Sequence, residues 1–92
     1  MTEQSFMKDP DSVLDYAFDW NTNWLQSGET ISSHVVTVAS GITKDSDSED
    51  SGIVTIWLSG GTAGSRYSVA CKIVTSYGRT DERTITIIVD DR

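Results

Sequence analysis

The chain has few of the residue types from which covalent frameworks and metal centres are built. It contains one cysteine (Cys71), one proline (Pro10) and one histidine (His34) among 92 residues. A single thiol cannot close an internal disulfide, which excludes a small secreted domain framed by disulfides. A histidine-based metal site needs more donors than His34 and Cys71 provide, so the sequence predicts no such site and no cofactor.

Long apolar runs and targeting signals are also missing from the sequence. No stretch reaches the roughly 18 apolar residues that a membrane-spanning helix needs. The first residues, MTEQSFMKDPDS, lack the basic-then-apolar order of a secretory signal peptide. We therefore expect a protein that is made in a reducing cytoplasm and does not enter a membrane.

Positive charge is scarce, with seven Lys and Arg against fourteen Asp and Glu and a net charge of −7. This balance argues against nucleic acid and anionic membranes as partners, because both need a basic surface. The charge is uneven, since residues 1–50 carry ten acidic residues and only Lys8 and Lys44 as cations. The asymmetry would favour head-to-tail stacking or docking on a basic partner; the alternative is ordinary solubilising charge.

Apolar side chains at every second position predict an all-β protein. Strands are expected over residues 13–20, 31–40, 53–59, 66–76 and 83–91, and residues 44–52 are expected to form an acidic loop or a weak edge strand. Regular short strands with glycine turns favour a small immunoglobulin-like or fibronectin-type β-sandwich of six to seven antiparallel strands. We expect one domain over residues 12–92, preceded by a flexible polar segment over residues 1–11.

The alternation also predicts which side chains form the core. Trp24 and Leu25 are expected to close one end of it, and Tyr67 occupies the place of the tyrosine that opens the penultimate strand of immunoglobulin-like domains and bonds to backbone across the corner. The expected inward residues are Leu14, Tyr16, Phe18, Trp20, Val36, Val38, Val54, Ile56, Leu58, Tyr67, Val69, Cys71, Ile73, Ile85, Ile87 and Val89.

The sequence offers little that indicates catalysis. His34 could pair with a Ser or Asp, but it lies in a run of strand formers, and a small sandwich has little concavity. Cys71 lies in an apolar alternation, which favours a small buried hydrophobic residue over a nucleophile. SGGTAGS, residues 59–65, lacks the Lys and the helix of a phosphate-binding loop, so it is expected to be a turn.

The acidic run DSDSED provides a weak calcium candidate. Asp45, Asp47, Glu49 and Asp50 supply oxygen ligands of the kind that Ca²⁺ prefers. The run lacks the glycine at its sixth position and the glutamate at its twelfth that a calcium loop of this type carries. The alternative, which we favour, is a solvated acidic loop.

Two groups of residues are candidates for contact with a partner protein. Trp57 points away from Ile56 and Leu58 if the alternation holds, which would make it an interface anchor or a sugar-stacking residue; otherwise it is the core tryptophan. The second group lies in or beside the YGRTDE hairpin and is either a recognition tip or an exposed ion-pair cluster. It comprises Arg79, Asp81, Glu82 and Arg83.

Several segments together resemble a family of small tailed-bacteriophage virion proteins, described as fiber-tail adaptors with an immunoglobulin-like fold. They are KDPDSVLDYAFDW (8–20), GETI (28–31), WLSGGTAGSRYSV (57–69) and TSYGRTDERTITIIVDDR (75–92). The chain departs from the family at Val36, where an aromatic residue is usual, at Ala39, where proline is usual, and in its richer acidic run. These departures concern core packing and not the identification.

The resemblance implies a non-enzymatic structural module of the virion, synthesised in the host bacterial cytoplasm. It would dock on a tail, neck or fiber component, in several copies set by the symmetry of the particle. We expect the contact residues to be Trp57 and the hairpin, with Asp15 and Asp19 supplying complementary charge. The alternative is a carbohydrate-binding, cell-surface-binding or capsid-decoration module. An enzymatic function is the least favoured hypothesis, because catalysis would need His34 to line a pocket.

Overall fold

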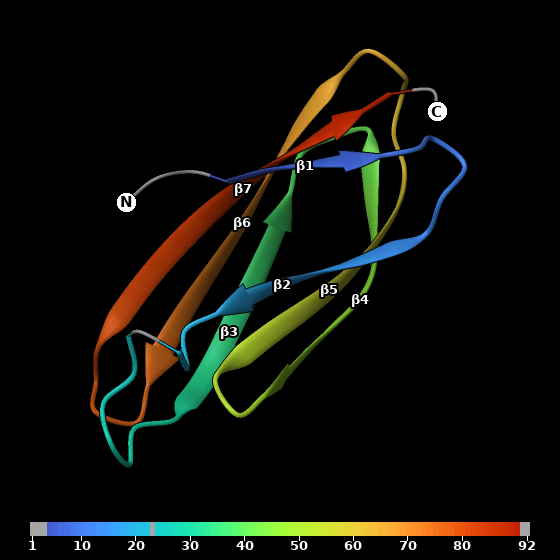
Figure 1. Cartoon of the computed structure of the whole chain (residues 1–92). Helices are drawn as coiled ribbons and strands as arrows, with labels where there is room; N and C mark the ends of the chain where they lie inside the picture. The colour runs from blue at the N-terminus through green and yellow to red at the C-terminus, as the bar shows by residue number, and fades with distance from the viewer. Residues whose placement is uncertain (1–3, 23, 91–92) are drawn as a thin grey trace.

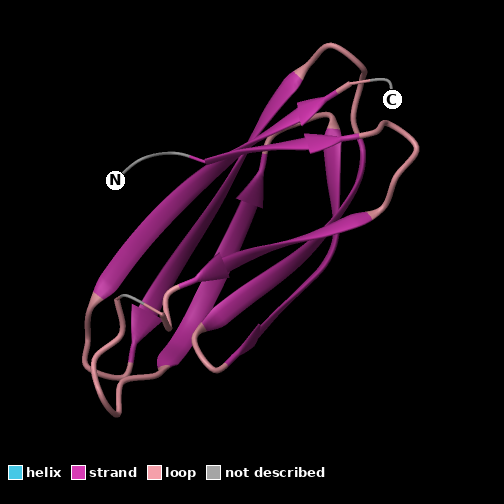
Figure 2. Ribbon diagram, viewed as in Figure 1, coloured by secondary structure: helices cyan, strands magenta, loops and turns pink. Residues whose placement is uncertain are grey.

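The computed structural model describes residues 4–22 and 24–90, which form seven strands and no helix (Figures 1 and 2). Among these residues there is accordingly no helix long and apolar enough to cross a membrane. The strands are β1 (Gln4–Lys8), β2 (Leu14–Asp19), β3 (Ile31–Val38), β4 (Ile42–Asp50), β5 (Ile53–Gly60), β6 (Arg66–Thr75) and β7 (Thr80–Val89).

The strands form two sheets that pack as a sandwich, which confirms the predicted fold class. One sheet has the order β1-β7-β6-β3 and the other has the order β2-β5-β4. The order β2-β5-β4 opposite β7-β6-β3 corresponds to the B-E-D and G-F-C sheets of an immunoglobulin constant domain. All neighbouring strands are antiparallel except β1 and β7, which pair in parallel. The strands of residues 12–92 are thus antiparallel as predicted, and β1, in a segment for which no strand was expected, adds the parallel pair.

The core consists of the side chains that the alternation places between the two sheets. The residues expected to point inward from β5, β6 and β7 are all buried, as are Tyr16, Phe18 and Trp20. Val36, Val38, Trp24 and Leu25 are half-buried against this core. Leu14 departs from the prediction and is 38 % exposed, because it begins a strand at the edge of its sheet.

The N-terminal segment differs from the prediction. Residues 4–8 form β1, which pairs with β7 in the register Gln4 to Ile85 through Lys8 to Val89. Phe6 packs on Tyr16 with ring centres 5.4 Å apart, and Lys8 is fully buried, with its ammonium donating to the carbonyls of Asp9 and Gly60. These contacts hold in place a segment that was predicted to be flexible because of its polar composition. Residues 1–3, which belong to the same predicted flexible segment, lie outside the described residues.

The predicted tyrosine corner is present at the start of β6. The backbone N–H of Thr62 donates to the hydroxyl of Tyr67 over 2.9 Å. Gly61 has a φ of +95°, and a β-carbon there would come within 2.7 Å of the Val89 side chain. The turn after β5 therefore depends on glycine both for its backbone angle and for its close approach to β7.

The connections between strands gather at the two ends of the sandwich. Figure 1 shows the β2–β3 loop, the β4–β5 turn and the β6–β7 hairpin at one end, and the β1–β2, β3–β4 and β5–β6 connections at the other. The acidic run belongs to β4, an edge strand, so the edge-strand alternative was correct and the loop alternative was wrong.

Candidate docking surfaces

Trp57 lies on the outer face of the β2-β5-β4 sheet. The neighbouring residues of its strand, Ile56 and Leu58, are fully buried, whereas Trp57 is 43 % exposed. It lies opposite Asp15 on β2 and opposite Ser46 on β4. The outward orientation is therefore confirmed, and the fully buried tryptophan of the core is Trp20.

Acidic residues surround Trp57 on this face. The pairing register places Asp15, Asp19 and Asp50 at outward positions, and a hydrogen bond from the outward Ser59 places Asp45 on the same side. Within residues 4–22 and 24–90, none of the four forms an ion pair. We call this surface, with Trp57 at its centre, the Trp57 face; its acidic residues are Asp15, Asp19, Asp45 and Asp50.

Two of these carboxylates are held in place by neutral donors. Asp19 accepts hydrogen bonds from the backbone of Asn21 and from the backbone and hydroxyl of Thr22. These bonds, those of Thr22 foremost, keep the pKa of Asp19 below its usual value. Asp45 accepts a hydrogen bond from the Ser59 hydroxyl over 2.9 Å. Asp19 is thus ionised at neutral pH.

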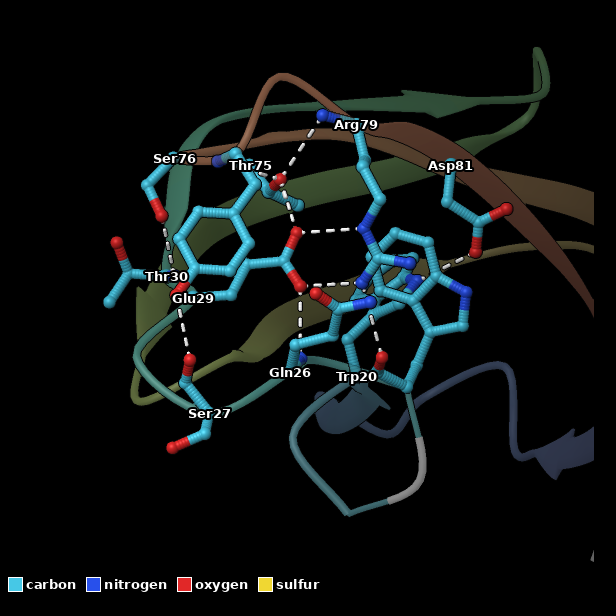
Figure 3. Close-up of polar contacts among 11 residues, drawn as sticks. Trp20, Gln26, Ser27, Glu29, Thr30, Thr75, Ser76, Arg79 and Asp81 are labelled. Carbon is cyan, nitrogen blue, oxygen red and sulfur yellow. Dashed lines mark hydrogen bonds and ion pairs between the residues drawn. The ribbon is translucent and has the colours of Figure 1, made fainter.

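The hairpin between β6 and β7 is joined to the β2–β3 loop by Arg79 and Glu29, as Figure 3 shows. The Arg79 guanidinium donates two hydrogen bonds to the Glu29 carboxylate, with Nε 2.9 Å from Oε2. Glu29 also accepts from the Thr75 hydroxyl and the Gln26 backbone and is only 5 % exposed. The hydrogen bonds from Arg79 are the main reason that the pKa of Glu29 falls to about 2.

Two of the other predicted hairpin residues, Asp81 and Arg83, also have partners inside the molecule. Asp81 accepts a hydrogen bond from the indole of Trp20 over 2.8 Å, also drawn in Figure 3. Arg83 lies over the Trp20 ring at 4.7 Å and donates to the Asp19 carbonyl. Glu82 is exposed and lies opposite Lys72 on β6. The ion pairs at this hairpin therefore also involve a residue outside it, Glu29, and their side chains are partly buried. The cluster alternative expected exposed pairs.

The carboxylates of the acidic run do not converge on one point. Asp47 lies 2.7 Å from Nε2 of His34 and also pairs with Lys44, the larger cause of its lowered pKa. Glu49 instead accepts from the backbone of Gly52. In the described part of the chain no group of three or more His, Cys, Asp or Glu side chains is placed to hold a metal ion. Strand alternation thus separates the ligands of the weak calcium candidate.

A shallow depression of about 420 Å³ lies at the end of the sandwich that carries the β2–β3 loop. Its lining includes Asn21, Leu25, Glu29, Glu49 and Gly52. His34 is not part of this lining, because it pairs with Asp47 between β3 and β4. The arrangement required for a His34-based active site, an imidazole in a pocket, does not occur in this depression.

Sequence reasoning missed Glu29 as the partner of Arg79. The two residues are fifty positions apart, and nothing in the local pattern of GETI distinguishes a buried carboxylate from a solvated one. The available signal was a lone acidic residue beside a glycine in a loop that follows Trp24 and Leu25.

Comparison with known proteins assigns the chain to a family. No curated protein matches the chain. A family model described as podophage GP4 fiber-tail adaptor protein gp77 matches residues 8–88, which cover β2 to β6 in full, β7 except its last residue and only the last residue of β1. The chain therefore belongs to the podophage GP4 fiber-tail adaptor protein gp77 family.

Proposed function

We propose that the chain is a non-enzymatic structural adaptor of a podophage particle and acts by docking on a tail, neck or fiber protein. The family to which it belongs supports the adaptor role. The protein is made in the host bacterial cytoplasm and becomes a component of the virion. Several copies are present, in a number set by the symmetry of the particle.

The docking contact is centred on Trp57. A half-exposed tryptophan in the middle strand of a mostly polar face is the single observation that carries this proposal. Tryptophan is enriched among the residues that dominate binding energy at protein interfaces. Asp15 and Asp19 on the same face supply charge that complements a basic partner.

The β6–β7 hairpin provides a second, rigid contact. Its tip carries Tyr77, which is 52 % exposed while its hydroxyl donates to the carbonyl of Ser27. The exposed Glu82 follows along β7, and Arg79, Asp81 and Arg83 hold the hairpin through their internal partners. Rigidity of this kind reduces the entropy lost on binding.

The proposal is tested by Trp57→Ala in a complementation assay. Phage lacking the adaptor gene are grown with wild-type or variant chain, and the copies of the chain per particle are counted by quantitative mass spectrometry. We expect a folded variant that is depleted from particles, because the side chain contributes to docking and not to the core. Unchanged incorporation of a folded Trp57→Ala variant would rule out Trp57 as the contact.

A further inference from the structure

Two of the three tryptophans in the chain carry an arginine on the face of the ring. The guanidinium carbon of Arg79 lies 4.0 Å from the ring centre of Trp24, and that of Arg83 lies 4.7 Å from the ring centre of Trp20. Each arginine also pairs with a carboxylate, Arg79 with Glu29 and Arg83 with Asp81. The same three-part arrangement of indole, guanidinium and carboxylate therefore occurs twice in this small protein.

Trp57 has the carboxylate of this arrangement but not the cation. It lies directly opposite Asp15 in the β2–β5 register, and such pairs have β-carbons about 5 Å apart. No cation lies over its ring among residues 4–22 and 24–90, whereas both other tryptophans have one. Asp15 forms no ion pair within the same residues.

The rest of the Trp57 face does not supply a cation either. The outward positions of β2, β4 and β5 carry four carboxylates, the hydroxyls of Ser and Thr, Ala17 and Ile53, with no Lys, Arg or His. Lys44 on β4 lies opposite the buried Leu58, so it belongs to the inner side, where it pairs with Asp47. The face is open along both edges, because β2 and β4 are both edge strands.

We propose that Trp57 and Asp15 receive an arginine side chain from another virion protein, a refinement that rests on the adaptor function proposed above. A guanidinium stacks on an indole and donates two parallel hydrogen bonds to a carboxylate, whereas a lysine ammonium is a compact charge that cannot do both equally well. Asp19, Asp45 and Asp50 attract and retain the surrounding basic segment. The occupant is therefore a basic, arginine-containing segment of the partner.

A second copy of the Trp57 face is not a suitable occupant. Two such faces would bring eight carboxylates together with no cation at their outward positions, and like charges at an interface are strongly unfavourable. A second copy could approach only with a different surface, such as the outer side of β6, which carries Arg66 and Lys72. Self-association of the purified chain that is lost in Trp57→Ala would overturn the proposal.

The test measures binding of the full chain to particles assembled without it. Trp57→Ala is expected to bind about 30-fold more weakly, the minimum for an interface hot spot. Asp15→Asn is expected to bind about tenfold more weakly and to show a smaller dependence on salt. Asp11→Asn, an equal change of charge in the β1–β2 loop, serves as the matched control and should bind like wild type.

Chemical modification of the particles distinguishes arginine from lysine. Pretreatment of the chain-free particles with phenylglyoxal, which blocks arginine, is expected to abolish binding, whereas acetylation of lysine is expected to leave most of it. Loss of binding after acetylation alone would overturn the choice of arginine. Binding that is lost in Trp57→Ala but kept in Asp15→Asn and after phenylglyoxal treatment would overturn the inference alone. Failure of the wild-type chain to bind at all would overturn the proposed function with it.

Discussion

Arg79 and Glu29, fifty residues apart, form a bidentate pair that joins the β6–β7 hairpin to the β2–β3 loop. The carboxylate is buried, and the hydroxyl of Thr75 and the backbone of Gln26 donate to it as well. A buried carboxylate is tolerated only with such a complete set of donors. The pair therefore fixes the end of the sandwich at which the hairpin, the β2–β3 loop and the β4–β5 turn meet (Figure 1).

Replacing Glu29 by Gln is expected to lower the melting temperature and to loosen the β2–β3 loop. The amide cannot accept both hydrogen bonds from Arg79, and its NH₂ group would face donors. Hydrogen exchange should show loss of protection at Gln26, Glu29 and Ser76, whose amides are bonded in this region. Glu82→Gln is the control, since exposed substitutions usually change stability by no more than about 0.5 kcal/mol. Equal behaviour of the two variants would contradict this role for Glu29.

The stability that Glu29 provides is expected to depend on pH in a defined window. Its pKa in the folded protein is about 2, against an ordinary value of 4.5, so the folded state favours the ionised form. The contribution is therefore complete above pH 4.5 and is lost as the pH falls towards 2. The difference in melting temperature between wild type and Glu29→Gln, measured from pH 6 to pH 2, should shrink across this window. A difference that stays constant would show that ionisation of Glu29 does not matter.

Gly61 and Gly64 both have positive φ, but they are expected to respond differently to substitution. Gly64→Ala places its β-carbon in open space, so it should lower the free energy of unfolding only by the backbone penalty of about 1–2 kcal/mol. Gly61→Ala also forces a β-carbon to within 2.7 Å of Val89, which should add about 1–3 kcal/mol. Denaturant unfolding of both variants measures the difference. Equal losses of unfolding free energy in the two variants would mean that the turn at Gly61 does not approach β7 closely.

Cys71 is expected to be inert in the folded protein. Its side chain is fully buried, and burial is the main reason that the pKa of its thiol rises to about 12. Because the thiolate is the reactive form, iodoacetamide at pH 8 should leave the native chain unmodified and should modify the denatured chain completely. Mass spectrometry measures the extent of modification in the native and in the denatured chain. Rapid modification of the native chain would show that β6 opens readily.

The alternation of side chains was sufficient to predict most of the fold. It identified the inward rows of β5, β6 and β7 because each of these strands buries every second residue in one continuous core. It also placed Trp57 outward and Tyr67 at its corner. These features depend on local periodicity and on one tight turn, and both are determined by residues that are close together in the sequence.

The remaining features depend on contacts that are distant in the sequence. β1 is a polar segment that forms a strand because it pairs with the edge of β7 and because Lys8 donates a hydrogen bond to the carbonyl of Gly60. Glu29 is buried because Arg79 reaches it across fifty residues. The sequence did indicate that Trp57, Asp15 and Asp19 are candidates. Only the strand register places Asp50 on the same face, and only the hydrogen bond from Ser59 places Asp45 there.

Oxidative footprinting of Trp57 in free chain and in intact particles tests the central claim most directly. Hydroxyl radicals oxidise exposed side chains, and mass spectrometry measures the yield at Trp57 and at Met7, an exposed residue of the other sheet that serves as an internal reference. Docking through the Trp57 face predicts that oxidation of Trp57, relative to Met7, falls several-fold when the chain is in the particle. An unchanged ratio would contradict docking through this face.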